Sequence, residues 1–117
     1  MAQKLKHRRK LPDAEVRQAS LERLGYVSYR QYLAGALWRE IRRKVLDRDK
    51  TCRICKEAPP TQVHHYRYTF EVMKGKKQHL KYLIGVCREC HEGIEFEDAR
   101  KRAPEEVRAE TRRLQRS

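Results

Sequence analysis

The feature of this sequence that most restricts its fold is a set of four cysteines arranged as two C-x-x-C pairs. The first pair is Cys52 and Cys55, and the second pair, which follows after 31 residues, is Cys87 and Cys90. A tight turn within each pair directs both thiolates at one ion, and two such turns complete a tetrahedral site. A redox site needs only one pair and a thioredoxin-like βαβ context, which is absent here. The spacing therefore favours a structural zinc ion that contributes directly to folding.

The composition explains why a chain of this kind needs a metal ion to fold. It has 117 residues, of which 38% are hydrophobic and another 38% are charged. One small domain with so little apolar material has a marginal core. We see no apolar segment of the length of a membrane span and no secretory signal. We therefore expect a cytoplasmic protein, in which a pair of disulfides would be the less favoured use of the cysteines.

The charge of the chain predicts a polyanionic partner. With 29 Lys and Arg against 16 Asp and Glu, the net charge is +13, and nucleic acid is the simplest partner. The segment Met1–Lys10 predicts a basic arm that either attracts phosphates or only keeps the chain soluble. Other basic side chains fall on a helix expected over residues 29–46 and in a turn expected around residues 74–77, between two expected strands. The candidates for nucleic-acid binding are Arg39, Arg42, Arg43, Lys74, Lys76, Lys77 and Lys81.

The apolar periodicity and the turn signals predict a mixed α+β chain. Apolar residues recur every four positions between residues 33 and 45, with Trp38 beside them as an expected core residue. Pro12 and Gly25 are typical of the two ends of a helix. We expect helices over residues 13–24, 29–46 and 88–102, another helix from Pro104, and short strands over residues 61–66 and 82–86.

Histidines beside the cysteines are candidate metal ligands. His64 and His65 are neighbours in an expected strand, so their side chains point to opposite faces. His91 directly follows the last cysteine, and Glu95 lies four residues later on the same face of the expected helix. Although each histidine alone is more often structural, His64, His91 and Glu95 together form a candidate site for a divalent cation with open positions.

The motifs that carry a family resemblance lie within residues 29–97. They are Tyr32-Leu33, Trp38, Arg42, Val45-Leu46, Arg48-Asp49, Cys52-x-x-Cys55, Val63-His64-His65, Leu83-Ile84-x-Val86-Cys87-x-x-Cys90-His91 and Ile94. In this order and spacing they resemble the HNH endonuclease family, and most closely its small zinc-bound type, often encoded by bacteriophages and bacteria. We accordingly expect an HNH domain over residues 29–97, a basic arm with a short helix over 1–28, and a charged helix or tail over 98–117.

The resemblance implies a ββα-metal fold in which two strands and a helix hold one divalent ion. By position, His65 resembles the general base that activates water, His64 a metal ligand, and His91 the last histidine of the motif. The ion would be Mg²⁺ or Mn²⁺, although imidazole ligands also admit Ni²⁺ or Zn²⁺. The implied activity is hydrolysis of DNA phosphodiester bonds with little sequence preference, either by nicking or by cutting both strands.

Two positions depart from the family pattern. Where the family has Asn or Asp, this chain has Tyr82, a candidate catalytic residue that could donate a hydrogen bond but is a poor metal ligand. Glu95 replaces a second helix histidine and can still bind a hard cation. Three functions therefore remain open: a metal-dependent DNA endonuclease, a weak or inactive HNH module that binds nucleic acid or assists packaging, and a purely structural zinc protein. The resemblance implies duplex DNA as partner and, in a bacterial or phage-infected cell, packaging proteins such as a terminase.

Overall fold

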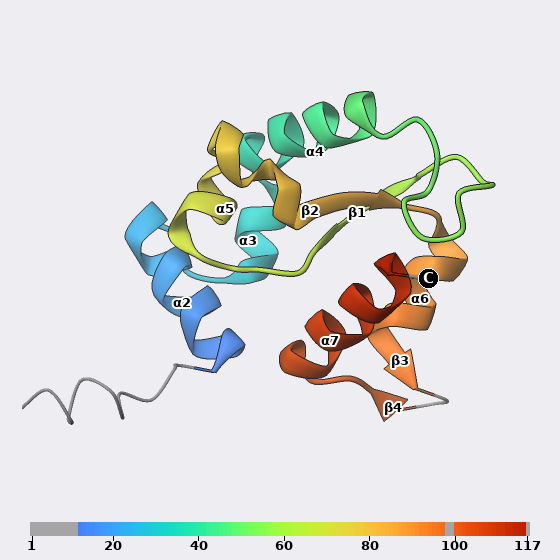
Figure 1. The fold of residues 1–117 in the computed structure, drawn as a ribbon. Coiled ribbons are helices and arrows are strands. Elements are labelled where there is room, and N and C mark those ends of the chain that lie inside the picture. Colours follow the sequence, from blue (N-terminus) through green and yellow to red (C-terminus); the bar gives the residue numbers. More distant parts are fainter. Residues whose placement is uncertain (1–11, 98–99, 117) are drawn as a thin grey trace, which may run out of the picture.

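The computed structural model describes residues 12–97 and 100–116, which form a mixed α+β fold (Figure 1). The segment Met1–Lys10, expected to be a basic arm, lies outside the described residues. None of the described helices has the length and apolar character needed to cross a membrane. The elements are α2 (Asp13–Leu24), α3 (Tyr29–Ala34), α4 (Ala36–Arg48), β1 (Gln62–His65), α5 (Phe70–Lys74), η1 (Lys77–Tyr82), β2 (Leu83–Val86), α6 (Arg88–Glu95), β3 (Phe96–Glu97), β4 (Arg100–Lys101) and α7 (Pro104–Gln115).

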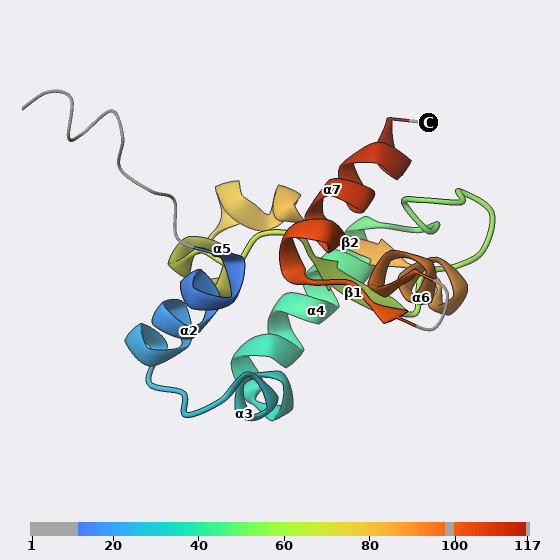
Figure 2. The same cartoon turned by 90° about the horizontal axis from the view of Figure 1, so that it is seen from below.

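An antiparallel pair of strands, β1 and β2, forms the centre of the fold. Gln62 pairs with Val86, and His65 pairs with Leu83, so both expected strands are confirmed with slightly shorter bounds. The helix α4 lies on one side of this pair, whereas α6 and α7 lie on the other (Figures 1 and 2). Because both faces are covered, all four residues of β2 are buried.

The expected helices are present with two differences. The helix over residues 13–24 is confirmed, whereas the one expected over residues 29–46 is two helices, α3 and α4. Gly35 separates them in an extended conformation, with φ −92° and ψ 171°, so the helical hydrogen bonds cannot run through it. The helix expected over residues 88–102 ends at Glu95, and the following residues form the β3–β4 hairpin, in which Phe96 pairs with Lys101.

The connection between β1 and β2, where the sequence predicted only a turn, folds into α5 and η1. Gly75 ends α5 with φ +78°, a left-handed conformation that favours glycine. A β-carbon at this position would lie 2.5 Å from Cγ1 of Ile41, so the glycine also permits a close approach to α4. The Tyr32 hydroxyl strengthens this packing because it donates a buried hydrogen bond of 2.6 Å to the Met73 carbonyl.

The hydrophobic core joins helices from both sides of the expected domain boundary at residue 29. Leu21 of α2 packs in one cluster with Trp38 of α4 and Leu83 of β2, so α2 is part of the same core as residues 29–97. Trp38 is 7% exposed, which confirms the core position expected for it. A smaller cluster around Ile84 and Val86 packs against the cysteine loop.

Asp49, which follows α4, ties the helix to β2 near the first cysteine. Its carboxylate accepts hydrogen bonds from the Arg48 guanidinium at 2.8 and 2.9 Å and from the Gly85 backbone N–H at 2.8 Å. Burial acts to raise the pKa of Asp49, but these hydrogen bonds outweigh it and hold the pKa below its usual value. Because these donors hold the buried carboxylate, Asp49 fixes the position of the backbone where the cysteine loop begins.

Candidate metal centres

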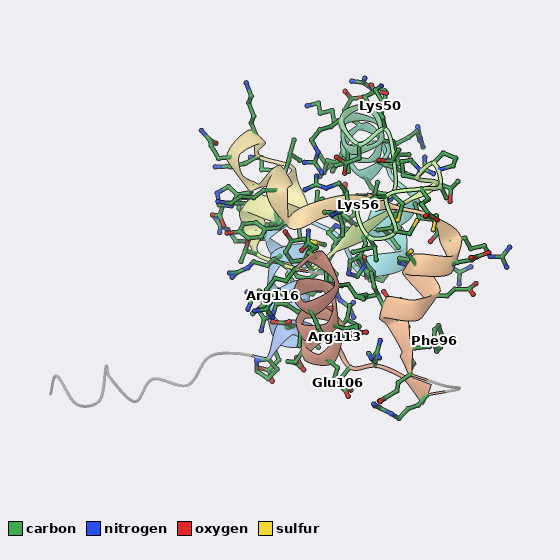
Figure 3. The ribbon with its side chains drawn as sticks, turned by 45° about the vertical axis from the view of Figure 1, so that its right-hand side comes forward. Lys50, Lys56, Phe96, Glu106, Arg113 and Arg116 are labelled. Atoms are coloured by element: carbon green, nitrogen blue, oxygen red, sulfur yellow. The ribbon has the colours of Figure 1, made fainter. Side chains whose placement is uncertain are left out.

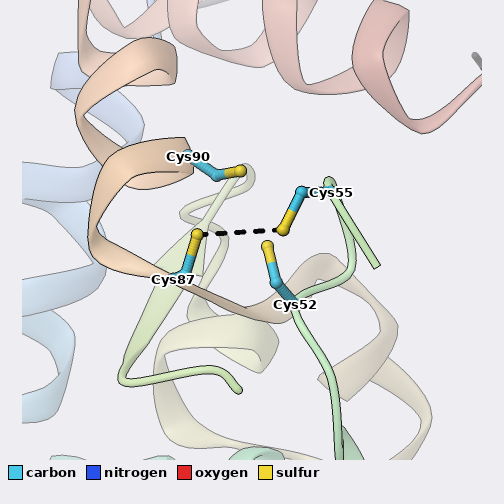
Figure 4. A group of neighbouring side chains, drawn as sticks. All are labelled: Cys52, Cys55, Cys87 and Cys90. Carbon is cyan, nitrogen blue, oxygen red and sulfur yellow. Dashed lines mark hydrogen bonds between the residues drawn. The ribbon is translucent and has the colours of Figure 1, made fainter. Parts of the chain in front are cut away.

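The structure brings the four predicted cysteines together. Cys52 and Cys55 come from the loop after α4, and Cys87 and Cys90 lie at the start of α6 with their sulfur atoms directed at the first pair (Figure 4). The Sγ atoms of Cys55 and Cys87 are 3.9 Å apart. Four thiolates placed about 2.3 Å from a tetrahedral zinc ion would lie about 3.8 Å from one another. The donor set and spacing therefore fit a structural metal such as zinc.

The backbone around the first pair favours the thiolate form of Cys52. The Ile54 N–H donates to Cys52 Sγ at 3.4 Å. Burial acts to raise the pKa of Cys52, but the N–H groups of Cys87, Cys55 and Ile54 lower it to about 6. Burial and the neighbouring thiols raise the pKa of Cys90 instead. Sulfur atoms this close repel one another as anions, so a divalent cation would relieve the repulsion.

The structure also brings together the three predicted ligands of the second centre. Glu95 Oε1 lies 3.8 Å from His64 Nδ1 and 3.6 Å from His91 Nε2, and the three ligand atoms lie within 4.8 Å of one another. Ligands about 2.1 Å from a tetrahedral ion would be about 3.4 Å apart, so a small contraction would close this group on an ion. Three ligands would leave positions open for water or a phosphate.

The surroundings of His64 keep its imidazole in the form that binds metals. The side chain is 2% exposed. Burial first, and then the charge of His91, lowers the pKa of His64 to about 3. A buried imidazole of this kind is neutral at neutral pH, and neutral imidazole is the metal-binding form.

His65 does not belong to this group. It faces the opposite side of β1 and is 3% exposed, and its ring stacks with those of Trp38 and Tyr68 at centroid distances of 4.6 and 5.5 Å. Its Nδ1 is 3.2 Å from the Tyr29 hydroxyl, and its buried Nε2 has no hydrogen-bond partner among the described residues. Burial first, and then the nearby His64 and a cationic side chain, lowers its pKa to about 3. This position differs from that expected of a base that contacts an attacking water.

Tyr82 also lies away from the second centre. Its ring contacts Tyr66 at a centroid distance of 5.9 Å, and the Arg67 guanidinium lies 4.8 Å from its centroid. This places Tyr82 at the end of η1, where it packs against aromatic and basic neighbours. In the described structure, His65 is not part of the group formed by His64, His91 and Glu95, and Tyr82 does not line the cleft beside that group.

A cleft of about 770 Å³ opens beside the second centre. His91 and Glu95 are in its wall. The other lining residues come mainly from α2, α3, α4, β1, α6, β3, β4 and α7. Phe96 projects from β3 at this end of the molecule and is 42% exposed (Figure 3). The basic side chains that line the cleft are Arg17, Arg42, Arg100, Lys101 and Arg102.

The residues predicted to bind nucleic acid are distributed over two surfaces. Arg42 lines the cleft and donates to the Thr61 carbonyl at 2.8 Å. Arg39 is exposed beside it on α4, whereas Arg43 forms ion pairs of 2.6 and 2.9 Å with acidic residues of its own helix. The four predicted lysines lie on α5, η1 and the turn between them, and none lines the cleft: Lys74, Lys76, Lys77 and Lys81.

Arg17 is a site residue that sequence reasoning missed. Its guanidinium carbon lies 4.6 Å from the centroid of Tyr29 and 5.3 Å from that of Tyr68. Within the described part of the chain no carboxylate forms an ion pair with it, whereas Arg100 and Arg102 pair with glutamates. The basic character of residue 17 was visible in the sequence, but no local signal placed α2 at the cleft.

The fold and these two centres define the class of protein: a small α+β protein with a four-cysteine cluster and a separate His-His-Glu group beside a basic cleft. Comparison with protein-family models, curated proteins and solved structures finds no match to this chain. Its function is therefore argued from the geometry of these centres.

Proposed function

We propose that this protein is a divalent-metal-dependent DNA endonuclease of the HNH type. The observation that carries the proposal is the convergence of His64, His91 and Glu95 within 4.8 Å of one another. They come from one strand of an antiparallel pair and from the helix that follows it, which is the arrangement that the sequence resemblance implies. In this proposal the four cysteines hold a structural zinc ion and take no part in the chemistry.

The second centre has the chemistry that phosphodiester hydrolysis requires. Two imidazoles and one carboxylate fit Mg²⁺ or Mn²⁺ and also admit Ni²⁺ or Zn²⁺. Bound there, such an ion would neutralise charge on the scissile phosphate and on the leaving oxygen. Glu95 Oε1 lies 3.8 Å from His64 Nδ1 and 3.6 Å from His91 Nε2, so the three atoms would face one ion together. The cleft in front of His91 and Glu95 gives a phosphate access to the centre.

The cleft supplies positive charge for a polyanionic substrate. Arg17 lies against two tyrosine rings in the cleft wall and has no carboxylate partner among the described residues, so its charge is available to a phosphate. Arg42 is anchored in the cleft wall by its bond to the Thr61 carbonyl and can take part in the same interaction. Such contacts neutralise the backbone and do not read base sequence, which agrees with low sequence specificity.

For His65 to act as general base, its side chain must become accessible from the cleft. A general base must come within hydrogen-bond reach of the proton it abstracts. His65 would have to leave its stack with Trp38 and Tyr68, or these rings would have to open the cleft to it. The role therefore couples catalysis to a movement of the cleft wall, since Trp38 and Tyr68 also line the cleft.

One observation favours a second candidate function, a module that binds nucleic acid without cutting it. His65 is buried among aromatic rings, and Tyr82, at the family's Asn or Asp position, packs its ring against Tyr66 and Arg67. A chain that lost these two catalytic elements could keep the zinc centre, the basic cleft and nucleic-acid binding. This candidate predicts binding of DNA with no cleavage under any divalent ion.

A plasmid-nicking assay with the zinc-loaded protein and added Mg²⁺ or Mn²⁺ tests the proposal. We expect the wild-type protein to convert supercoiled plasmid to the open-circular form. His91→Ala and Glu95→Gln should reduce the rate at least about 100-fold, because each removes a ligand. Glu89→Gln removes the same charge from an exposed site on the same helix and should cut like the wild type. Binding without cleavage by the wild type would overturn the proposal in favour of the second candidate.

A further inference from the structure

Thr111 of α7 lies against His64, which is 47 positions earlier in the chain. The Thr111 oxygen Oγ1 is 2.9 Å from His64 Nε2, and both side chains are buried, with exposed fractions of 0% and 2%. The helix α7 passes beside the strand pair next to α6 (Figure 2). It thereby gives the His64 ring a polar contact through Nε2, while Nδ1 faces the metal-binding group.

The hydrogen bonds of Thr111 determine which partner donates. Its hydroxyl already donates to the Val107 carbonyl at 2.7 Å, one turn earlier in α7. A hydroxyl has a single proton, so Thr111 can only accept a hydrogen bond from His64. A neutral imidazole carries its proton on one nitrogen and a lone pair on the other. The network therefore assigns the proton to Nε2.

The other nitrogen is directed at the proposed metal centre. Within the part of the chain that the structure describes, His64 Nδ1 makes no hydrogen bond, and Glu95 Oε1 lies 3.8 Å away, beyond hydrogen-bond distance. We infer that Thr111 is a positioning residue that holds His64 in the Nε2–H tautomer, with the Nδ1 lone pair directed between His91 and Glu95. That this lone pair binds a metal ion rests on the proposed function, whereas the assignment of the tautomer does not.

The opposite tautomer would block the centre. With the proton on Nδ1, the hydrogen would point at Glu95, and Thr111 would have to turn its hydroxyl from Val107 to His64. An outer partner that accepts from the second nitrogen of a ligand histidine fixes both the tautomer and the ring orientation. Removing the acceptor would leave a buried Nε2–H without a partner and favour the Nδ1–H form, which faces a carboxylate.

The experiment compares wild type, Thr111→Val and Thr111→Ser as full chains loaded with a single zinc ion per chain, enough for the cysteine centre alone. Valine keeps the shape of threonine but lacks the acceptor, whereas serine retains it. Long-range ¹H–¹⁵N correlation spectra at about pH 7.5, where a buried imidazole is neutral, report which nitrogen of His64 is protonated. We expect Nε2–H in the wild type and in Thr111→Ser, and a shift toward Nδ1–H in Thr111→Val. A wild-type ring protonated on Nδ1, or an unchanged tautomer in Thr111→Val, would overturn the inference.

Titration with Mn²⁺, followed by electron paramagnetic resonance, adds a second readout. Thr111→Val should bind Mn²⁺ about 10- to 100-fold more weakly than the wild type, and Thr111→Ser within about threefold of it. Circular dichroism confirms that each variant is folded. If the wild type shows the Nε2–H tautomer but binds no Mn²⁺ and cuts no plasmid, the proposed function fails and the tautomer assignment stands. If it binds Mn²⁺ with the opposite tautomer, the inference about Thr111 fails alone.

Discussion

The imidazole of His65 stacks on the indole of Trp38, with ring centroids 4.6 Å apart and planes inclined by 23°. The ring of Tyr68 also stacks on the imidazole, with a centroid distance of 5.5 Å. His65 is therefore an integral part of the core, although its neighbour His64 faces the proposed metal centre. The same two-residue stretch of β1 thus supplies both packing and a candidate ligand.

Substitutions of His65 separate its packing role from its proposed catalytic role. His65→Ala should lower the free energy of unfolding by about 3 kcal/mol, because it leaves a cavity between two aromatic rings. His65→Phe fills this space and should cost less. Urea unfolding measures both, and His79→Ala, at a partly exposed site in η1, is the control. A folded His65→Phe variant that cuts plasmid like the wild type would exclude His65 as the general base.

Loss of the cysteine centre should unfold the protein, whereas loss of the histidine centre should not. Cys52→Ser removes a buried ligand of the proposed zinc site, whose binding energy supports the fold. Circular dichroism should show loss of helical signal in this variant, and a strong chelator should produce the same loss in the wild type. His91→Ala, at a partly exposed position, should keep the wild-type spectrum. Equal loss of signal in the two variants would contradict this division of roles.

Gly75→Ala should destabilise the protein without affecting either centre directly. The added β-carbon would lie 2.5 Å from Ile41 Cγ1, and the backbone has φ +78°, which is unfavourable for alanine. We expect a loss of about 2 to 4 kcal/mol in urea unfolding, from overpacking and backbone strain together. Gly93→Ala is the matched control, since a β-carbon added there would have no neighbouring atom within 4 Å and should not destabilise α6. A Gly75→Ala variant as stable as the wild type would show that α5 can move away from α4.

Arg17 should contribute to DNA binding through phosphate contact. Arg17→Met removes the cation from the cleft while retaining an apolar stem against Tyr29 and Tyr68. Fluorescence anisotropy with a labelled duplex should show weaker binding and a salt dependence reduced by about one counterion. Arg30→Met removes the same charge from an exposed position on α3 that does not line the cleft. Equal effects of the two variants would mean that only net charge matters.

The ligand groups could be predicted because they are encoded in residue type and short spacing. The two-residue gap within each cysteine pair, and the step of one helical turn from His91 to Glu95, fix which side chains share a turn or a helix face. The same kind of local signal located α2 and both central strands. Local sequence signals predicted the structure less well where tertiary packing decides where a helix ends. Gly35 divides a long apolar pattern, and the hairpin after Glu95 replaces helical turns that the sequence would also allow.

The sequence by itself determined the candidate metal-ligating side chains, the excess of positive charge and the alternation of His64 and His65. Only the tertiary structure decided that His65 is enclosed by Trp38 and Tyr68, that Arg17 reaches the cleft, and that Thr111 contacts His64. Apart from the contact of His65 with the nearby Tyr68, these contacts join segments far apart in the chain. No short-range pattern encodes such contacts, because they arise when helices bury their apolar faces against one shared pair of strands.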